Sequence, residues 1–148
     1  MIEPDDIVFA DFGPLFEEWE ADFGRTWVLG DDPVKRRLAD DLVEVWAAGR
    51  RFFDEDPDVT GEQLYAEVVR LTEERGWTFG NFHCGHAVGQ FPHEEPTDDV
   101  VGALLMEGNG EPLRRVDPSG RVVHWILEVH LVDRDREIGG FHEELLTI

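Results

Sequence analysis

The pattern of apolar and polar residues predicts strands at both ends of the chain and two helices between them. Residues 6–12 and 23–29 are short apolar runs, and the turn signal Gly13-Pro14 follows the first. An aspartate lies inside the first run and another directly precedes the second. We expect an antiparallel strand pair, with residues 14–21 as a hairpin connection that has an acidic outer face.

The middle of the chain has the spacing of two amphipathic helices. Asp32-Pro33 joins a capping residue to a proline suited to the first helical position, and apolar residues then recur at helical spacing to about Phe53. A second helix is expected from Thr60, where T-x-x-Q has the pattern of a capping box, to Gly76.

After the second helix the pattern returns to strands. Residues 81–96 are expected to form strand and loop, and residues 97–120 a loop-rich segment. Residues 122–132 (VVHWILEVHLV) form the strongest predicted strand, residues 134–140 a turn, and residues 141–148 a final strand. This order predicts one α+β domain, with a mostly antiparallel sheet and a helix pair on one face.

Composition and charge narrow the class of protein. A chain of 148 residues with 41% hydrophobic content suits one globular domain. A net charge of -21 argues against nucleic-acid binding and against adsorption on anionic membranes. Solubility, a salty cytoplasm and bound divalent cations each explain such acidity. A lone cysteine, no signal sequence and no apolar run of membrane length indicate a cytoplasmic protein.

Five ionisable residues lie inside or beside the predicted strands, where a charge is costly unless something neutralises it. They are Asp11, Asp22, His86, Glu128 and Glu143. Any one of them alone is best explained as a side chain on the solvent face of a sheet. Taken together, the carboxylates and the imidazole suit two adjacent divalent ions, such as Mn, Co, Fe or Zn.

The segment 81–96 (NFHCGHAVGQFPHEEP) holds half of the 6 histidines and the only cysteine. From its first histidine it resembles the G-H-G-I-G…H-E-E-P signature of the pita-bread metallopeptidases, which include methionine aminopeptidases, Xaa-Pro aminopeptidases, prolidases and creatinase. Other segments resemble the ligand-bearing strands of that family: DIVFADFG, ADFGRTWVLG, WILEVH and GGFHEELL. Together they reproduce the ligand order D…D…H…E…E from about Asp5 to the C-terminus.

This resemblance implies a pita-bread fold and a role for each candidate ligand. Asp11 would chelate one metal ion, and Asp22 and Glu143 would bridge both ions. His86 and Glu128 would complete the coordination of the second ion.

The resemblance also implies an activity. The protein would act as an aminopeptidase of the Xaa-Pro or general type, cleaving a short peptide near its N-terminus with a metal-bridged hydroxide. Glu128 would accept a proton from the bridging water, and His93 would donate a hydrogen bond to the scissile carbonyl or the tetrahedral intermediate. The family pattern favours Glu143 over Glu144 as the last ligand.

Among the other ionisable residues of these segments, His83 has no clear counterpart in the family, and we expect it to be structural or to lie close to the ligands. We expect Cys84 to be a small buried packing residue. The remaining histidines lie on the strands that bear Glu128 and Glu143; a place beside the ligands is one alternative, and a position on the surface of the sheet is favoured: His124, His130 and His142.

A pita-bread domain consists of two related halves, and this chain resembles one half more completely than the other. Residues 1–30 resemble the strand hairpin of the first half and residues 31–148 the second half, so residues 1–148 would form one truncated catalytic domain. The hairpin face that the missing helices would cover is expected to be apolar and either exposed or covered by a partner, for example in a homodimer. A catalytically idle binding module and a creatinase-like C–N hydrolase remain alternatives.

Overall fold

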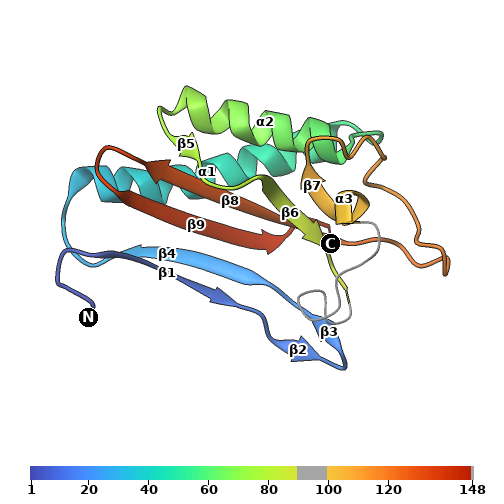
Figure 1. The fold of residues 1–148 in the computed structure, drawn as a ribbon, viewed down its shortest axis with the longest axis horizontal. Helices are drawn as coiled ribbons and strands as arrows, with labels where there is room; N and C mark the ends of the chain where they lie inside the picture. Colours follow the sequence, from blue (N-terminus) through green and yellow to red (C-terminus); the bar gives the residue numbers. More distant parts are fainter. Residues whose placement is uncertain (90–99, 148) are drawn as a thin grey trace.

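A computed structural model describes residues 1–89 and 100–147, and it contains one sheet with two helices packed on one of its faces (Figure 1). The strand order is β1-β4-β9-β8-β6-β7, with β5 paired to β8 outside this path. All strand pairs in the sheet are antiparallel. The predicted α+β class, with a helix pair on one face of an antiparallel sheet, is confirmed.

The first hairpin consists of the predicted strand pair and a short additional ribbon in its connection. Strands β1 (Ile7–Phe12) and β4 (Phe23–Val28) pair from Ile7 opposite Val28 to Phe12 opposite Phe23. The connection, for which no strands were predicted, contains a two-stranded ribbon of β2 (Leu15–Phe16) and β3 (Trp19–Glu20). The connection is only partly acidic: Glu17 and Glu18, with φ of 49° and 76°, form the turn and Glu20 ends β3, but the ribbon also exposes Leu15, Phe16 and Trp19.

Both predicted helices are present, with the predicted caps. Helix α1 (Pro33–Glu55) begins after Asp32, whose side chain accepts hydrogen bonds from the amides of Val34 and Lys35. Helix α2 (Gly61–Glu74) begins with the complete capping box of Thr60 and Gln63. Gly76, at φ +80°, follows its end. Over residues 1–89 and 100–147, no helix is both long enough and apolar enough to span a membrane.

The second half of the sheet follows the helices. It consists of β5 (Thr78–Phe79), β6 (His83–Ala87), β7 (Leu104–Met106), β8 (Trp125–Asp133) and β9 (Ile138–Leu145). A short helix, α3 (Val100–Ala103), precedes β7 in a segment where only loop was predicted. The predicted turn 134–140 is too long, because Gly139 and Gly140 already belong to β9. A side chain at Gly140 would collide with Leu38 and Leu42 of α1, so the glycine allows the helix to approach the strand.

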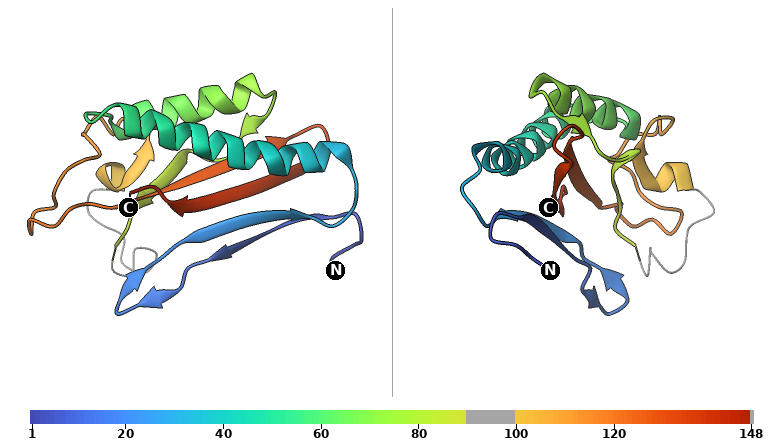
Figure 2. Two further views of the ribbon diagram at one scale, coloured as in Figure 1. Left: turned by 180° about the vertical axis from the view of Figure 1, so that it is seen from behind. Right: turned by 60° about the vertical axis from the view of Figure 1, so that its left-hand side comes forward.

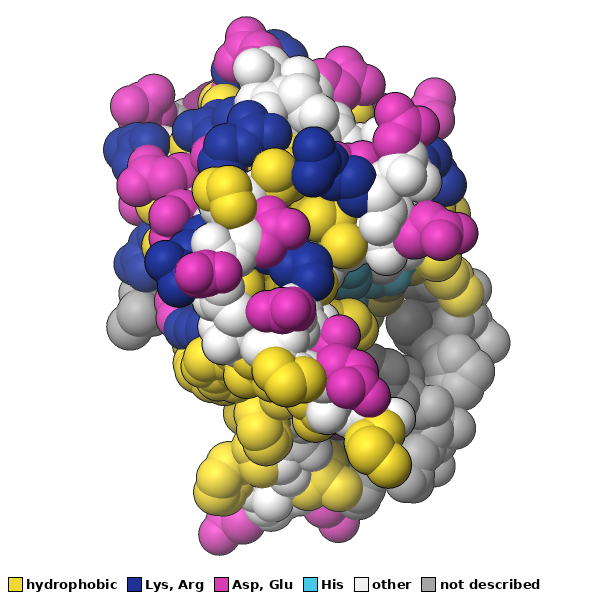
Figure 3. All heavy atoms as spheres, turned by 90° about the vertical axis from the view of Figure 1, so that its left-hand side faces the viewer, with side chains coloured by type: hydrophobic (Ala, Val, Ile, Leu, Met, Phe, Trp, Pro, Cys, Tyr) yellow, Lys and Arg dark blue, Asp and Glu magenta, His cyan; other side chains and the backbone are white. Residues whose placement is uncertain are grey.

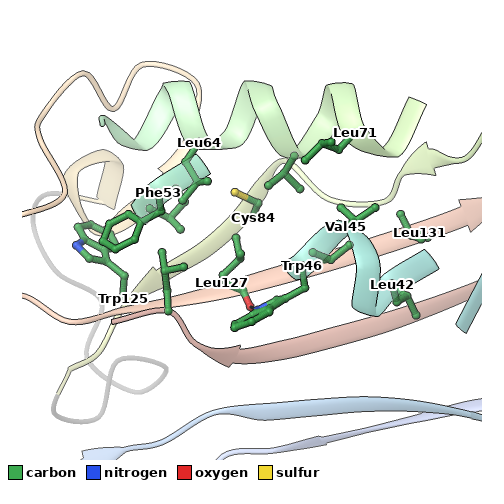
Figure 4. Close-up of a cluster of buried hydrophobic side chains, with 14 of the residues drawn as sticks. Leu42, Val45, Trp46, Phe53, Leu64, Leu71, Cys84, Trp125, Leu127 and Leu131 are labelled. Carbon is green, nitrogen blue, oxygen red and sulfur yellow. Dashed lines mark hydrogen bonds between the residues drawn. The ribbon is translucent and has the colours of Figure 1, made fainter. Parts of the chain in front are cut away.

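The hydrophobic core lies between the helices and one face of the sheet (Figure 4). Leu127, Val129 and Leu131 of β8 belong to this core, and the indole of Trp46 on α1 donates a hydrogen bond of 3.0 Å to the carbonyl of Leu127. Because side chains alternate along a strand, Glu128 lies on the opposite face of β8. The functional residues are therefore expected on the face turned away from α1 and α2.

The β1–β4 hairpin projects on the side of the sheet away from the helices (Figure 2). In both views α1 and α2 cover β8 and β9, while no described helix covers the outer side of the hairpin. One face of this hairpin is therefore available for contact with another molecule.

Candidate metal centre

A row of directly opposed residues crosses four neighbouring strands and collects three of the candidate ligands. Asp11 of β1 pairs with Gly24 of β4, Gly24 pairs with Glu143 of β9, and Glu143 pairs with Glu128 of β8. Directly paired residues point to the same face of a sheet, so the three carboxylates share the face away from the helices. Gly24 leaves room in this row, since a side chain there would collide with the ring of Phe141.

Asp22 and His86 reach the same face from positions beside this row. Asp22 lies two residues before Gly24, and His86 of β6 is paired with Ile126, two residues before Glu128. Ligand atoms of Asp22, His86 and Glu143 all lie within 4.8 Å of one another. The structure therefore brings together side chains from three distant parts of the chain at the predicted place.

The other two candidate ligands lie beside this cluster. Oε1 of Glu128 is 3.6 Å from Nε2 of His86, which is also 3.3 Å from Oδ2 of Asp22. Asp11 is solvent-exposed, but it is close enough to contribute to the raised pKa of Glu143. All five predicted ligands thus surround one region, with Asp22, His86 and Glu143 closest together.

Burial and like charge control protonation in the metal-free cluster. Burial raises the pKa of Glu143, and the negative charges of Glu128, Asp22 and Asp11 raise it further, to about 9. For His86, burial lowers the pKa, but Asp22, the carbonyl of Ala87 and Glu128 outweigh this effect and raise it to about 9. Without a cation, the cluster thus retains protons at neutral pH.

The two adjacent glutamates near the C-terminus have different partners. Glu144 forms an ion pair with Arg25, whereas Glu143 is only 3% exposed and belongs to the Asp22–His86 cluster. The guanidinium of Arg25 also donates to the carbonyl of Glu143, at 2.9 Å. This geometry supports the choice of Glu143 over Glu144 as the candidate ligand.

For His130 the structure favours the alternative over the preferred expectation. Nε2 of His130 lies 3.0 Å from Oε2 of Glu128, so this histidine lies beside a candidate ligand and not simply on the surface of the sheet. Burial raises the pKa of Glu128, but the hydrogen bond from His130 and the nearby His83 and His86 outweigh it, and the pKa lies below its usual value. The i, i+2 spacing of Glu128 and His130 on a strand was the available signal.

The other side chains near the site have structural positions. Cys84 is fully buried in the core, as predicted. His142 is buried against Trp46 on the helix side, so the prediction of a sheet-surface position was wrong for this residue. His124 is exposed, as predicted. Gly85, at φ +139°, brings β6 against β8, where an added Cβ would lie 2.0 Å from the carbonyl oxygen of Ile126.

The chemistry of this donor set fits divalent metal ions. Oε2 of Glu143 is buried and, within the described part of the chain, has no hydrogen-bond partner, while the buried Oδ2 of Asp22 has only the 3.3 Å contact with Nε2 of His86. Buried carboxylate oxygens are normally satisfied, and a cation would satisfy both of these at once. Oxygen ligands with one imidazole suit Mn, Co, Fe or Zn. The predicted cleft residue His93 lies outside the described residues.

Comparison with known proteins identifies the family of this chain. The model of the family described as "Metallopeptidase family M24" matches residues 1–141. An Xaa-Pro dipeptidase from Pyrococcus horikoshii is 28% identical over 109 residues, which cover 72% of this chain and 31% of that protein. The chain thus matches about a third of the length of this relative.

Solved structures share the fold. An X-Pro aminopeptidase from Thermotoga maritima has a TM-score of 0.75 and 21% identity, over 99% of this chain and 41% of that chain. A methionine aminopeptidase from Rickettsia prowazekii has a TM-score of 0.69 and 17% identity, over 99% of this chain and 66% of that chain. These similarities confirm the pita-bread fold expected from the sequence. Together with the family match, they establish that the chain belongs to metallopeptidase family M24.

Proposed function

We propose that this protein is a metal-dependent exopeptidase that cleaves short peptides near the N-terminus, of the Xaa-Pro or general aminopeptidase type. The observation that carries this proposal is the convergence of Asp22, His86 and Glu143, with the buried Oε2 of Glu143 left without a hydrogen bond among the described residues. A protein that used this fold only for binding has no need of such a costly arrangement.

Two divalent ions would be held by the five ligands Asp11, Asp22, His86, Glu128 and Glu143. When bound, such ions activate water and polarise a carbonyl group. Asp22 and Glu143 would serve both ions, as the family resemblance implies, and their ligand atoms lie within 4.8 Å of each other. Asp11, on the exposed edge strand, would hold one ion from the open side.

The residues around the ligands suit the remaining steps of peptide hydrolysis. Glu128 has a lowered pKa and is ionised at neutral pH, so it can accept a proton from water. His93, in our proposal, donates a hydrogen bond to the carbonyl oxygen as negative charge develops on it.

Aromatic side chains next to the cluster suit an apolar substrate residue. The ring of Phe141 lies 5.9 Å from that of Phe9, and 4.7 Å from that of His130, beside the carboxylates of β8 and β9. Phe9 is 59% exposed, so an incoming side chain or a pyrrolidine ring can cover it. Cleavage of Xaa-Pro peptides is part of the proposal for this reason, and because relatives are named Xaa-Pro dipeptidases.

Metal binding followed by peptide turnover tests this function. We expect the protein to bind about two equivalents of Mn²⁺ or Co²⁺ in calorimetry, and Asp22→Asn to lose this binding. The matched control is Asp31→Asn, which changes an aspartate outside the site. With metal bound, a panel of Xaa-Pro and methionyl peptides should show release of the N-terminal residue. A protein that binds no metal would contradict the proposal.

A second candidate function is supported by the exposed apolar side chains of the hairpin. The chain covers 41% of the Thermotoga aminopeptidase structure, and residues 1–30 would supply only a hairpin of the first half-domain. A form that binds metal and peptide without turnover would act as a binding module. The peptide panel separates the two functions, because binding without release of an amino acid favours the module.

A further inference from the structure

The two carboxylate oxygens of Glu128 have different neighbours. Oε1 lies 3.6 Å from Nε2 of His86, on the side of the metal-ligand cluster. Oε2 lies 3.0 Å from Nε2 of His130 and 3.9 Å from Nδ1 of His83. Glu128 is only 6% exposed, so these contacts largely define its surroundings. The carboxylate thus presents one oxygen to the cluster and the other to a pair of histidines.

Only one of these two histidines can donate a hydrogen bond to Glu128. An ionised carboxylate only accepts, so the hydrogen in the short contact belongs to Nε2 of His130. Nδ1 of His83 accepts the amide hydrogen of Gly85 at 3.3 Å, and the distance of 3.9 Å to Glu128 is too long for a hydrogen bond. Both histidines therefore lie near Glu128, but only His130 donates a hydrogen bond to its carboxylate.

The ring of His130 is held in the orientation that this hydrogen bond requires. His130 follows Glu128 by two residues on β8, so both side chains lie on the same face. Its ring packs against Phe141 at 4.7 Å with an interplanar angle of 36°, and meets the ring of Phe79 edge-on at 6.1 Å. Contacts on two sides limit rotation of the imidazole away from the carboxylate.

We propose that His130 is a positioning residue that fixes the carboxylate of Glu128, through its hydrogen bond to Oε2, so that Oε1 is directed at the metal ions. This inference rests on the proposed metal-dependent function. The resemblance to the family assigns no role to this position. Hydrogen bonds to a metal-ligating carboxylate orient the ligand, and their loss typically weakens metal binding or activity by about 10- to 100-fold.

Mn²⁺ affinity of two matched variants tests the role of the His130 donor. His130→Phe keeps a ring against Phe141 and Phe79 but removes the donor, and we expect Mn²⁺ to bind about 10- to 100-fold more weakly. His130→Gln places an amide N–H near the position of Nε2 and should restore most of the affinity. The control is His83→Phe, which changes the neighbouring ring and should leave the affinity nearly unchanged.

The result that would overturn the proposal is equally specific. His130→Phe with the Mn²⁺ affinity of the parent protein rules it out, as does a loss that His130→Gln does not restore. An equal loss in His83→Phe also overturns it, because a general disturbance of the cleft then explains the effect. Melting temperatures of the metal-free variants show whether each variant is folded.

A second measurement uses the unsubstituted, metal-free protein and does not depend on metal binding. Nitrogen-15 NMR of the histidine side chains should show a hydrogen on Nε2 of His130, and Glu128→Ala should change the chemical shift of that nitrogen. A neutral ring with its hydrogen on Nδ1 would overturn the proposal. If the parent protein binds no Mn²⁺, the proposed function fails, while the NMR result still decides whether His130 holds Glu128.

Discussion

At the scale of single residues, Gly85 is the position where the backbone beside the site tolerates least change. A Cβ added there would lie 2.0 Å from the carbonyl oxygen of Ile126, and φ of +139° is unfavourable for any other residue. We expect Gly85→Ala to lower the free energy of unfolding by about 3 kcal/mol or more, from backbone strain and the steric clash together. Urea denaturation measures this change.

Gly120→Ala is the control for the strain alone. Gly120 also has a positive φ, of +85°, but a Cβ there would meet no atom within 4 Å. The expected loss is about 1 to 2 kcal/mol, the cost of a left-handed conformation without a clash. Equal losses in the two variants would show that β6 can move away from β8, and that the close approach does not matter.

The role of a single residue could be predicted from the sequence where the residues that identify it are close to it along the chain. The resemblance in sequence was enough to propose His86 and Glu143, because each lies in a short segment whose neighbouring glycines and acidic residues match the family pattern. It did not join His130 to Glu128, although their i, i+2 spacing puts them on one face, and it did not bury His142, because the packing of α1 on that face is a tertiary contact. Arg25, which takes Glu144 as its partner, lies more than a hundred residues away in sequence, and no local pattern links the two.

At the scale of elements, the antiparallel register of the strands places several carboxylates and an imidazole close together. Their raised pKa values predict that the stability of the metal-free protein depends on pH. In the metal-free protein the pKa values of Glu143 and His86 are both about 9, raised from 4.5 and 6.5. Between about pH 6.5 and 9 the folded state therefore holds more protons than the unfolded state, and its stability should fall as pH rises. Denaturation across this range measures the slope.

Saturating Mn²⁺ should remove this dependence, since metal ligands bind in their deprotonated forms and metal binding releases the retained protons. Glu143→Gln should reduce the slope in the metal-free protein but not abolish it, because Asp22, Ala87 and Glu128 still raise the pKa of His86. Glu144→Gln, which changes the neighbouring glutamate paired to Arg25, should leave the slope as it is. Stability that stays constant or rises from pH 6.5 to 9 in the metal-free protein would contradict the protonation assigned to the cluster.

Elements whose signals are local were predicted well. Both helix starts follow from side chains within three residues of the cap, so Asp32 and the Thr60–Gln63 pair identified them. The ribbon of β2 and β3, and the α3–β7 segment, were missed because each strand is only 2 or 3 residues long. Such strands show no measurable alternation, and tertiary contacts alone determine them.

At the scale of the whole molecule, the β1–β4 hairpin leaves a large apolar surface uncovered. Hydrophobic side chains gather at the lower end of the molecule, over this hairpin (Figure 3). Phe12, Phe23 and Trp27 lie on its outer face and are 53%, 44% and 48% exposed. The expectation of an exposed apolar hairpin face thus agrees with the structure, and continuous apolar surfaces of this kind usually mark contact sites.

This surface predicts dye binding by the native protein and association that increases with salt. A net charge of -21 makes copies of the chain repel one another, and salt screens that repulsion while leaving the apolar attraction. We expect a hydrophobic dye to fluoresce with the folded protein at low salt, and sedimentation to show a homodimer or larger species at molar salt.

The double substitution Phe12→Thr/Trp27→Thr should reduce both effects, because it makes the outer face polar. Val43→Thr, which replaces an exposed valine on α1, should change neither. A stable monomer at all salt concentrations, with no dye binding, would mean that this face needs no partner, and the hairpin would then be stable as a free edge of the sheet.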